Sequence, residues 1–164
     1  MPTISAPSEL KDLLGQMADR VILSVSEKAL SQLRETIRRD TYLFGGFPNK
    51  FYVMGTGLPT FEFLRAWKWR NVKTSVSERV RELFYEYFSM TFDPENYIHG
   101  SVEHGDRREA LAKDLNVSGI ALNSDFGGKE RRPYWDNYID EILYRGQLTK
   151  WFDEELLQFG FIKK

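Results

Sequence analysis

A stripe of apolar residues near the start of the chain constrains the fold more than any other feature of the sequence. Its members recur at steps of three and four residues, with charged and polar residues between them. The stripe consists of Leu10, Leu14, Met17, Val21, Val25, Ala29, Leu33 and Ile37. This spacing is that of one face of an α-helix, which repeats about every 3.6 residues. The sequence therefore predicts a long amphipathic N-terminal helix.

The two ends of this predicted helix carry local signals. Ser8 follows a proline and can cap the first turn, where Glu9 complements the positive end of the helix dipole. Gly15 is a position where the helix can break, and Arg38 and Arg39 suit its negative C-terminal end. The apolar stripe can pack on the domain's own sheet or form a seam between subunits, and the sequence leaves both alternatives open.

The length of 164 residues suits one domain with a sizeable core. We expect residues 1–7 to form a flexible N-terminal arm and residues 8–164 to form a single domain. The opening segment lacks the basic stretch and apolar run of a signal peptide. No segment has an uninterrupted apolar run long enough to span a membrane. We therefore expect a soluble protein made in the cytoplasm.

Aromatic residues crowd the middle of the chain, where 15 of the 24 lie within residues 42–97. Such crowding indicates either the main core or a surface that binds other chains, because aromatic rings dominate the energetics of both. Residues 61–69 alternate like a strand but also have the spacing of a helical turn, and for residues 83–92 a strand is favoured over a helix. We expect a small antiparallel sheet in this aromatic middle.

Further helices are predicted after the aromatic middle. Asp106 and Glu109 form a capping pattern for a short helix. Pro133 suits a first helical turn and opens an amphipathic segment that ends at Gly146, and a final helix covers residues 148–159. A long N-terminal helix, a partly β middle and C-terminal helices together define an α+β domain.

Motifs for catalysis or ligand binding are weak. The glycines of "GTGLPT" lack the spacing of a phosphate-binding loop, so they indicate a turn. His99 and His104, with Asp106 nearby, could serve a small metal-dependent hydrolase, but they lack the H-E-x-x-H spacing, and exposed loop histidines are the simpler interpretation. Cysteine is absent, which excludes disulfides, thiol catalysis and thiolate zinc sites. We expect no enzyme activity, no metal and no cofactor.

Several short motifs resemble one group of virion proteins. They are "IRRDTY", "GTGLPTFEFLRAW", "NYIHGS", "DRREALAKDLN", "RPYWDNYIDEI" and "KWFDEEL". These motifs, spread over most of residues 9–159, are similar to those of the small head–tail joining and tail-completion proteins of tailed bacteriophages, which are related to tail terminators. The matching positions are Gly55, Gly57, Leu58, Trp67, Tyr97, His99, Gly100, Arg132, Pro133, Tyr134 and Trp135.

The resemblance implies a non-enzymatic structural protein at the head–tail junction of a tailed bacteriophage. It implies a tail terminator, whose ring, often sixfold, ends the tail tube and joins it to the head; another neck or adaptor protein for head completion is the alternative. The implied partners are copies of the same chain, the tail tube protein and connector or neck proteins. Such a protein is in the host cytoplasm during assembly and in the virion afterwards, without a membrane partner.

Two sets of residues are candidate contacts under this hypothesis. Trp and Tyr contribute strongly to contacts between chains, and the candidate interface residues are Trp67, Trp69, Tyr97, His99, Trp135 and Trp151. The net charge of −1 gives no overall attraction to nucleic acid, but arginines cluster locally. The candidates for facing the ring lumen, in non-specific contact with packaged DNA, are Arg38, Arg39, Arg107 and Arg108. Paired arginines near helix ends can equally be solvated or bound to carboxylates.

Overall fold

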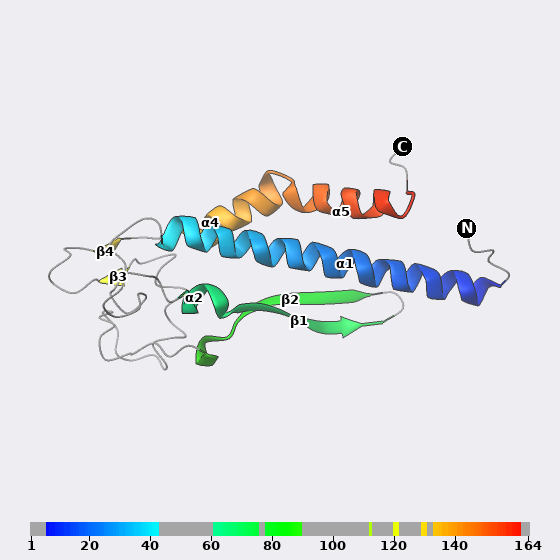
Figure 1. Cartoon of the computed structure of the whole chain (residues 1–164), viewed down its shortest axis with the longest axis horizontal. Helices are drawn as coiled ribbons and strands as arrows, with labels where there is room; N and C mark the ends of the chain where they lie inside the picture. The colour runs from blue at the N-terminus through cyan, green and yellow to red at the C-terminus, as the bar shows by residue number, and fades with distance from the viewer. Residues whose placement is uncertain are drawn as a thin grey trace.

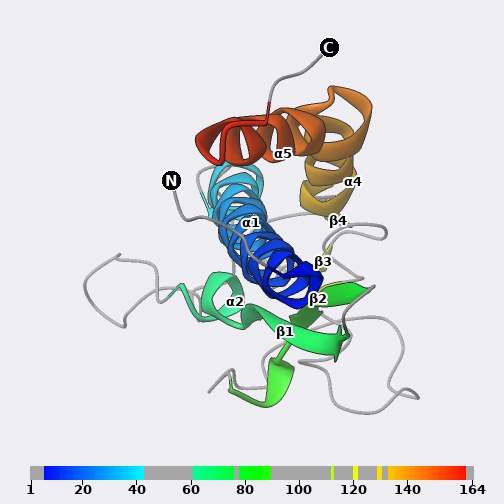
Figure 2. The same ribbon diagram turned by 90° about the vertical axis from the view of Figure 1, so that its right-hand side faces the viewer.

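The computed structural model describes residues 6–42, 61–75, 78–89, 112, 120–121, 129–130 and 133–161. One long helix, α1 (Pro7–Ile37), runs through the middle of the molecule. The hairpin of β1 (Trp67–Thr74) and β2 (Arg79–Tyr85) packs on one side of α1 (Figure 1, Figure 2). The helices α4 (Tyr134–Ile139) and α5 (Gln147–Gln158) cover another side. The predicted α+β class is confirmed.

Helix α1 starts before the predicted cap and has no break. Ala6 occupies the N-cap position, and its backbone N–H donates to Oε2 of Glu9 over 3.3 Å. Ser8 therefore lies inside the helix, because Pro7 suits a first turn whose N–H groups have no helical acceptor. The helix continues through Gly15 for 31 residues, about 46 Å, into the π-helical segment η1 (Arg38–Tyr42). Residues 1–5 of the expected arm lie outside the described residues.

The small antiparallel sheet in the aromatic middle is confirmed. β1 and β2 pair so that Trp67 faces Tyr85 and Trp69 faces Leu83. The segment that could be strand or helical turn contains both, since the short helix α2 (Glu62–Arg65) leads directly into β1. A separate two-residue pair joins β3 (Ile120–Ala121) to β4 (Lys129–Glu130).

The predicted bounds of the second strand, residues 83–92, are wrong. β2 begins earlier, at Arg79, and ends at Tyr85, where the 3-10 segment η3 (Tyr87–Ser89) follows. Arg79 and Arg81 are partly buried and alternate with exposed neighbours. Because arginines take these inward positions, the first half of the strand has no apolar pattern that would mark it.

The C-terminal helices are confirmed. α4 continues as the π-helical segment η7 (Asp140–Tyr144), and Gly146, with φ of 72°, separates it from α5. Glycine suits this position because other residues resist a positive φ. Pro133 is the N-cap of α4 rather than part of its first turn. Of the helix predicted near Asp106, only Ala112 is among the described residues, and it is helical.

The core lies where the hairpin, α4 and the C-terminal half of α1 meet. Phe63 is fully buried and makes edge-to-face contacts with Trp67, Tyr85 and Tyr134, at centroid distances of 6.5, 5.4 and 5.4 Å. Trp67 also stacks on Trp135 at 5.4 Å. Such ring pairs add to the free energy gained from burial. The buried apolar residues of α1 are Val21, Val25, Ala29, Leu30, Leu33 and Ile37.

A buried carboxylate links α5 to α1. Glu155 is 8% exposed, and its Oε1 accepts hydrogen bonds from Nζ of Lys28 (2.7 Å) and Oγ of Ser24 (2.6 Å). These hydrogen bonds, first from Lys28 and then from Ser24, hold the pKa of Glu155 below its ordinary value of 4.5. A lowered pKa in the folded state stabilises the fold above pH 4.5, and this stabilisation disappears as the pH falls through the lowered pKa.

Replacing Glu155→Gln should lower the free energy of unfolding by about 1 to 2 kcal/mol at pH 7, because charge-assisted hydrogen bonds to Lys28 and Ser24 are lost. The difference from wild type should be smaller at a pH well below 4.5, because the native carboxylate becomes protonated as the pH falls through its lowered pKa. Urea unfolding of both proteins, at pH 7 and at the lower pH, measures the two free energies of unfolding. Glu154→Gln is the control, because its side chain is 45% exposed and lies 3.6 Å from Lys28. If Glu155→Gln lowers the free energy of unfolding equally at both pH values, the ionised carboxylate of Glu155 is not the source of the stabilisation.

Candidate interaction surfaces

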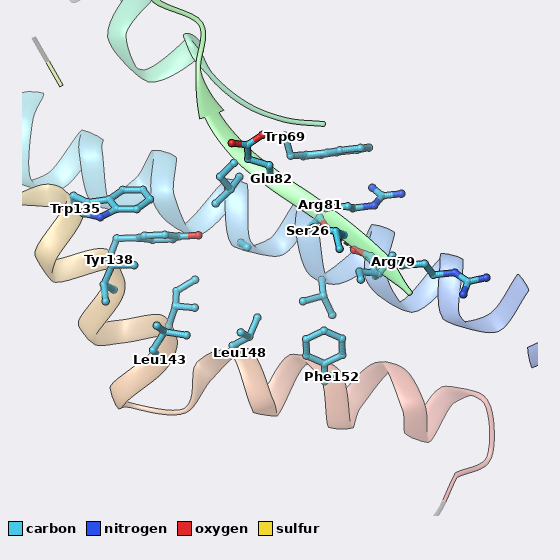
Figure 3. Close-up of a pocket in the computed structure, with 17 residues that line it drawn as sticks. Ser26, Trp69, Arg79, Arg81, Glu82, Trp135, Tyr138, Leu143, Leu148 and Phe152 are labelled. Carbon is cyan, nitrogen blue, oxygen red and sulfur yellow. Dashed lines mark hydrogen bonds between the residues drawn. The ribbon is translucent and has the colours of Figure 1, made fainter. Parts of the chain in front are cut away.

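An open groove of about 420 Å³ lies between the hairpin and the C-terminal helices (Figure 3). Ile22, Val25 and Ala29 of α1 form its floor. β2 and Trp69 form one wall. The opposite wall consists mainly of the apolar and aromatic side chains Trp135, Tyr138, Ile142, Leu143, Leu148 and Phe152. The groove therefore favours an occupant with apolar side chains.

β2 borders the groove with its edge rather than with one face. All five consecutive residues 79–83 line the groove. Side chains of a strand alternate between its two faces, so an unbroken run indicates that the groove follows the outer edge for about 16 Å. Among the described strands, only β1 pairs with β2. The groove edge of β2 thus carries backbone N–H and C=O groups that no described strand uses.

Trp135 and Tyr138 form the aromatic end of the groove (Figure 3). Their ring centroids lie 5.4 Å apart, and Trp135 also stacks on Trp67 of the core. Burial raises the pKa of the Tyr138 phenol well above its ordinary value, so the hydroxyl remains protonated at neutral pH. Because these rings are packed against the core, this end of the groove is formed before any partner binds.

Arg79, towards the other end of the groove, ties the hairpin to α1. It donates to the carboxylate of Asp19 and to the carbonyl oxygens of Gly15 (3.0 Å) and Ser75 (3.1 Å). The hydrogen bond from Arg79, with the charges of Arg79 and Arg81, holds the pKa of Asp19 below its ordinary value. The guanidinium of Arg79 is therefore committed to contacts inside the molecule.

Arg81, in contrast, has an unused hydrogen-bond donor. Its guanidinium lies over the ring of Trp69, 4.1 Å from the centroid. Its Nη1 is buried and has no hydrogen-bond partner among the residues that the structure describes. A buried donor without an acceptor is costly, and a carboxylate is the acceptor that a guanidinium binds most strongly. Arg81 thus gives the apolar groove one position that favours an anionic group.

The first turns of α1 form a second surface. They project beyond the ends of α5 and of the hairpin (Figure 1), and no residue of α1 before Val21 is buried. Leu10 and Leu14 continue the apolar stripe and are 44% and 47% exposed. An apolar helix face normally packs against another element. We refer to Leu10 and Leu14 as the α1 stripe; no other described part of the chain buries it.

The four candidate interface tryptophans divide into two pairs. Trp67 and Trp151 are each 8% exposed and belong to the core, so they are poor candidates for contact with another chain. The ring of Trp67 contacts Phe63, Tyr85, Tyr134 and Trp135, which lie on other elements, and the sequence pattern could not show these contacts. Trp69 and Trp135 are partly buried and line the groove. Tyr97 and His99 lie outside the described residues.

Of the four arginines predicted to face a ring lumen, the structure describes Arg38 and Arg39. Arg39 donates to Oδ1 of Asp40 (2.6 Å) and to Oε1 of Glu141 (2.9 Å), so it joins η1 to η7 and its charge is compensated within the chain. Arg38 is exposed. Arg107 and Arg108 lie outside the described residues. Their position relative to a ring lumen stays a prediction.

The candidate metal ligands His99, His104 and Asp106 also lie outside the described residues. In the part of the chain that the structure describes, no group of three or more His, Cys, Asp and Glu side chains could hold a metal ion. None of the helices in that same part combines the length and apolar character needed to cross a lipid bilayer.

The groove and Arg81 were not predicted from the sequence. Residues 79–82 read Arg-Val-Arg-Glu, in which the partly buried positions are charged and the apolar Val80 is exposed. No apolar alternation therefore marks the start of β2 in the sequence. The position of α5 across the groove from β2 has no local signal either, because it depends on contacts between segments far apart in the chain.

Comparisons with models of known protein families, with curated proteins and with solved structures found no match. The functional interpretation therefore depends on the sequence motifs and on the two surfaces described above.

Proposed function

We propose that this chain is a structural, non-enzymatic protein of a tailed bacteriophage, positioned at the head–tail junction. In this proposal it is a tail terminator, whose copies form a ring that ends the tail tube and joins it to the head. The motifs "GTGLPTFEFLRAW", "NYIHGS" and "RPYWDNYIDEI" support the proposal, because they resemble those of tail-completion proteins.

The α1 stripe is the observation that carries the assembly part of the proposal. Leu10 and Leu14 are nearly half exposed on a projecting helix, whereas the same stripe is buried in the core from Val21 onward. A ring of identical subunits needs two different, complementary surfaces on every copy. The α1 stripe supplies one such surface, and it lies at an end of the molecule where a neighbour can approach.

The α1 stripe is too small to hold a ring together alone. Stable protein interfaces bury roughly 1,200 Å² or more in total, and two half-exposed leucines provide only a small part of that area. In the proposal, contacts with the tail tube and neck proteins add to the contacts between copies. The free chain is therefore expected to associate weakly, with the ring forming fully at the tube end.

Replacing both Leu10→Glu and Leu14→Glu should weaken self-association. Light scattering at high protein concentration should give wild type a mean mass above the 19.3 kDa of one chain and the double variant a mass close to 19.3 kDa. The control is Ser8→Glu with Gln16→Glu, which adds two carboxylates at exposed polar positions of the same helix. The same mass for all three proteins would exclude the α1 stripe as a contact between copies.

Inactivating the gene in the phage or prophage genome that carries it tests the location of the protein. Electron microscopy of the lysate should show heads and tails that are not joined, and tubes of irregular length if the protein terminates the tail. Unjoined tails of normal length would instead indicate a neck or adaptor protein. Infectious, fully joined particles without the protein would overturn the proposed function.

A further inference from the structure

The groove between β2 and the C-terminal helices combines three properties that point to one kind of ligand. It follows a strand edge, it has an apolar floor and wall, and it contains the unsatisfied donor of Arg81 (Figure 3). Each property favours a different feature of the ligand: its extended backbone, its apolar side chains or a carboxylate. Together they are more specific than an apolar groove alone.

The strand edge selects an extended polypeptide. Residues 79–83 border the groove over about 16 Å, and no described strand pairs with that edge. An extended segment can pair with these backbone groups as an added strand, which is a common mode of peptide recognition. A compact small molecule fills an apolar pocket without using such a row of backbone groups.

The walls of the groove select apolar side chains on one face of that segment. Leu148 and Phe152 of α5 lie across the groove from β2, and Trp135 and Tyr138 form its aromatic end (Figure 3). In an added strand, every second side chain points to the same face. Alternate apolar residues would therefore enter the groove while their neighbours face solvent.

Arg81 selects a carboxylate. Its Nη1 is buried without a hydrogen-bond partner in the described part of the chain, and its guanidinium is held over Trp69. Arg79 is already bonded to Asp19 and to two carbonyl oxygens. Glu82 at the rim is paired with Arg70 at 2.9 Å, so its charge is compensated. An acidic ligand side chain near Arg81 would supply the missing acceptor.

We propose that this groove binds an extended segment of another polypeptide chain, which adds as a strand to β2, places alternate apolar side chains in the groove and brings an aspartate or glutamate to Arg81. The inference stands independently of the proposed function, because the groove selects these features whichever protein supplies the segment.

Selection from a displayed library of short random peptides, with the full chain as bait, provides the first test. Enriched peptides should alternate apolar residues and contain an acidic residue at a fixed position within that pattern. Selection of no peptide, or of peptides without this pattern, would overturn the proposal.

The best selected peptide then tests the contacts by fluorescence polarisation. Arg81→Met should weaken its binding by about tenfold or more, because a charge-assisted hydrogen bond is lost. Arg65→Met is the control, since Arg65 is an exposed arginine that does not line the groove. Equal affinity of both variants would exclude Arg81 as the carboxylate site.

A second pair of variants tests the apolar wall. Leu148→Glu places a charge in the groove and should abolish binding, whereas Leu157→Glu changes an exposed leucine of α5 that does not line it. Circular dichroism establishes that each variant is folded. Binding that survives Leu148→Glu would place the peptide elsewhere.

Two N-methylated versions of the peptide test strand addition on the unmodified protein. Methyl groups on every second backbone nitrogen block hydrogen bonds to a neighbouring strand in one register and leave them intact in the other. One version should therefore lose binding and the other should keep it. If both versions bind like the parent peptide, the segment does not add to β2 as a strand.

Discussion

The packing of aromatic rings around Phe63 is the interaction on which the rest of the structure depends. An isolated two-stranded hairpin is marginally stable in water at best. Phe63, fully buried, contacts rings from β1, β2 and α4, and Trp67 extends this packing to Trp135. The hairpin and the C-terminal helices are thus joined at one point, and the groove extends from that point along α1. The groove is therefore a consequence of how the core is packed.

The features that the sequence predicts correctly are those with local causes. The apolar stripe of α1 repeats with the helical period, and Gly146 ends the helix before α5 because its backbone has a positive φ. The α+β class follows from the order of these elements. The predicted cap at Ser8 is wrong by a small margin, since Pro7 suits the first turn and Glu9 accepts a hydrogen bond from the N–H of Ala6, so the helix starts earlier.

The features that the sequence does not predict depend on contacts between distant segments. Trp67 and Trp69 are two residues apart on one strand, yet only Trp67 is buried in the core while Trp69 lines the groove. Trp151 was a candidate for contact between chains, but it is 8% exposed and belongs to the core. No local pattern separates a tryptophan that fills the core from one that contacts a partner. The whole apolar face of α1 shows the same limit, because the sequence leaves both alternatives open and the structure buries only the residues from Val21 onward.

The two edges of the hairpin differ in a way that favours β2 as the site for an added strand. β1 carries Lys68, Arg70 and Lys73, which pair with glutamates on the outer face of the hairpin. Charged side chains of this kind commonly protect an edge strand from pairing with other chains. The edge of β2 also carries the charged residues Arg79, Arg81 and Glu82, but it lies beside an apolar wall, so a strand added there would bury the groove and extend the hairpin to three strands. A three-stranded sheet packed on a helix is a more stable unit than a hairpin, and binding at β2 would therefore stabilise the hairpin.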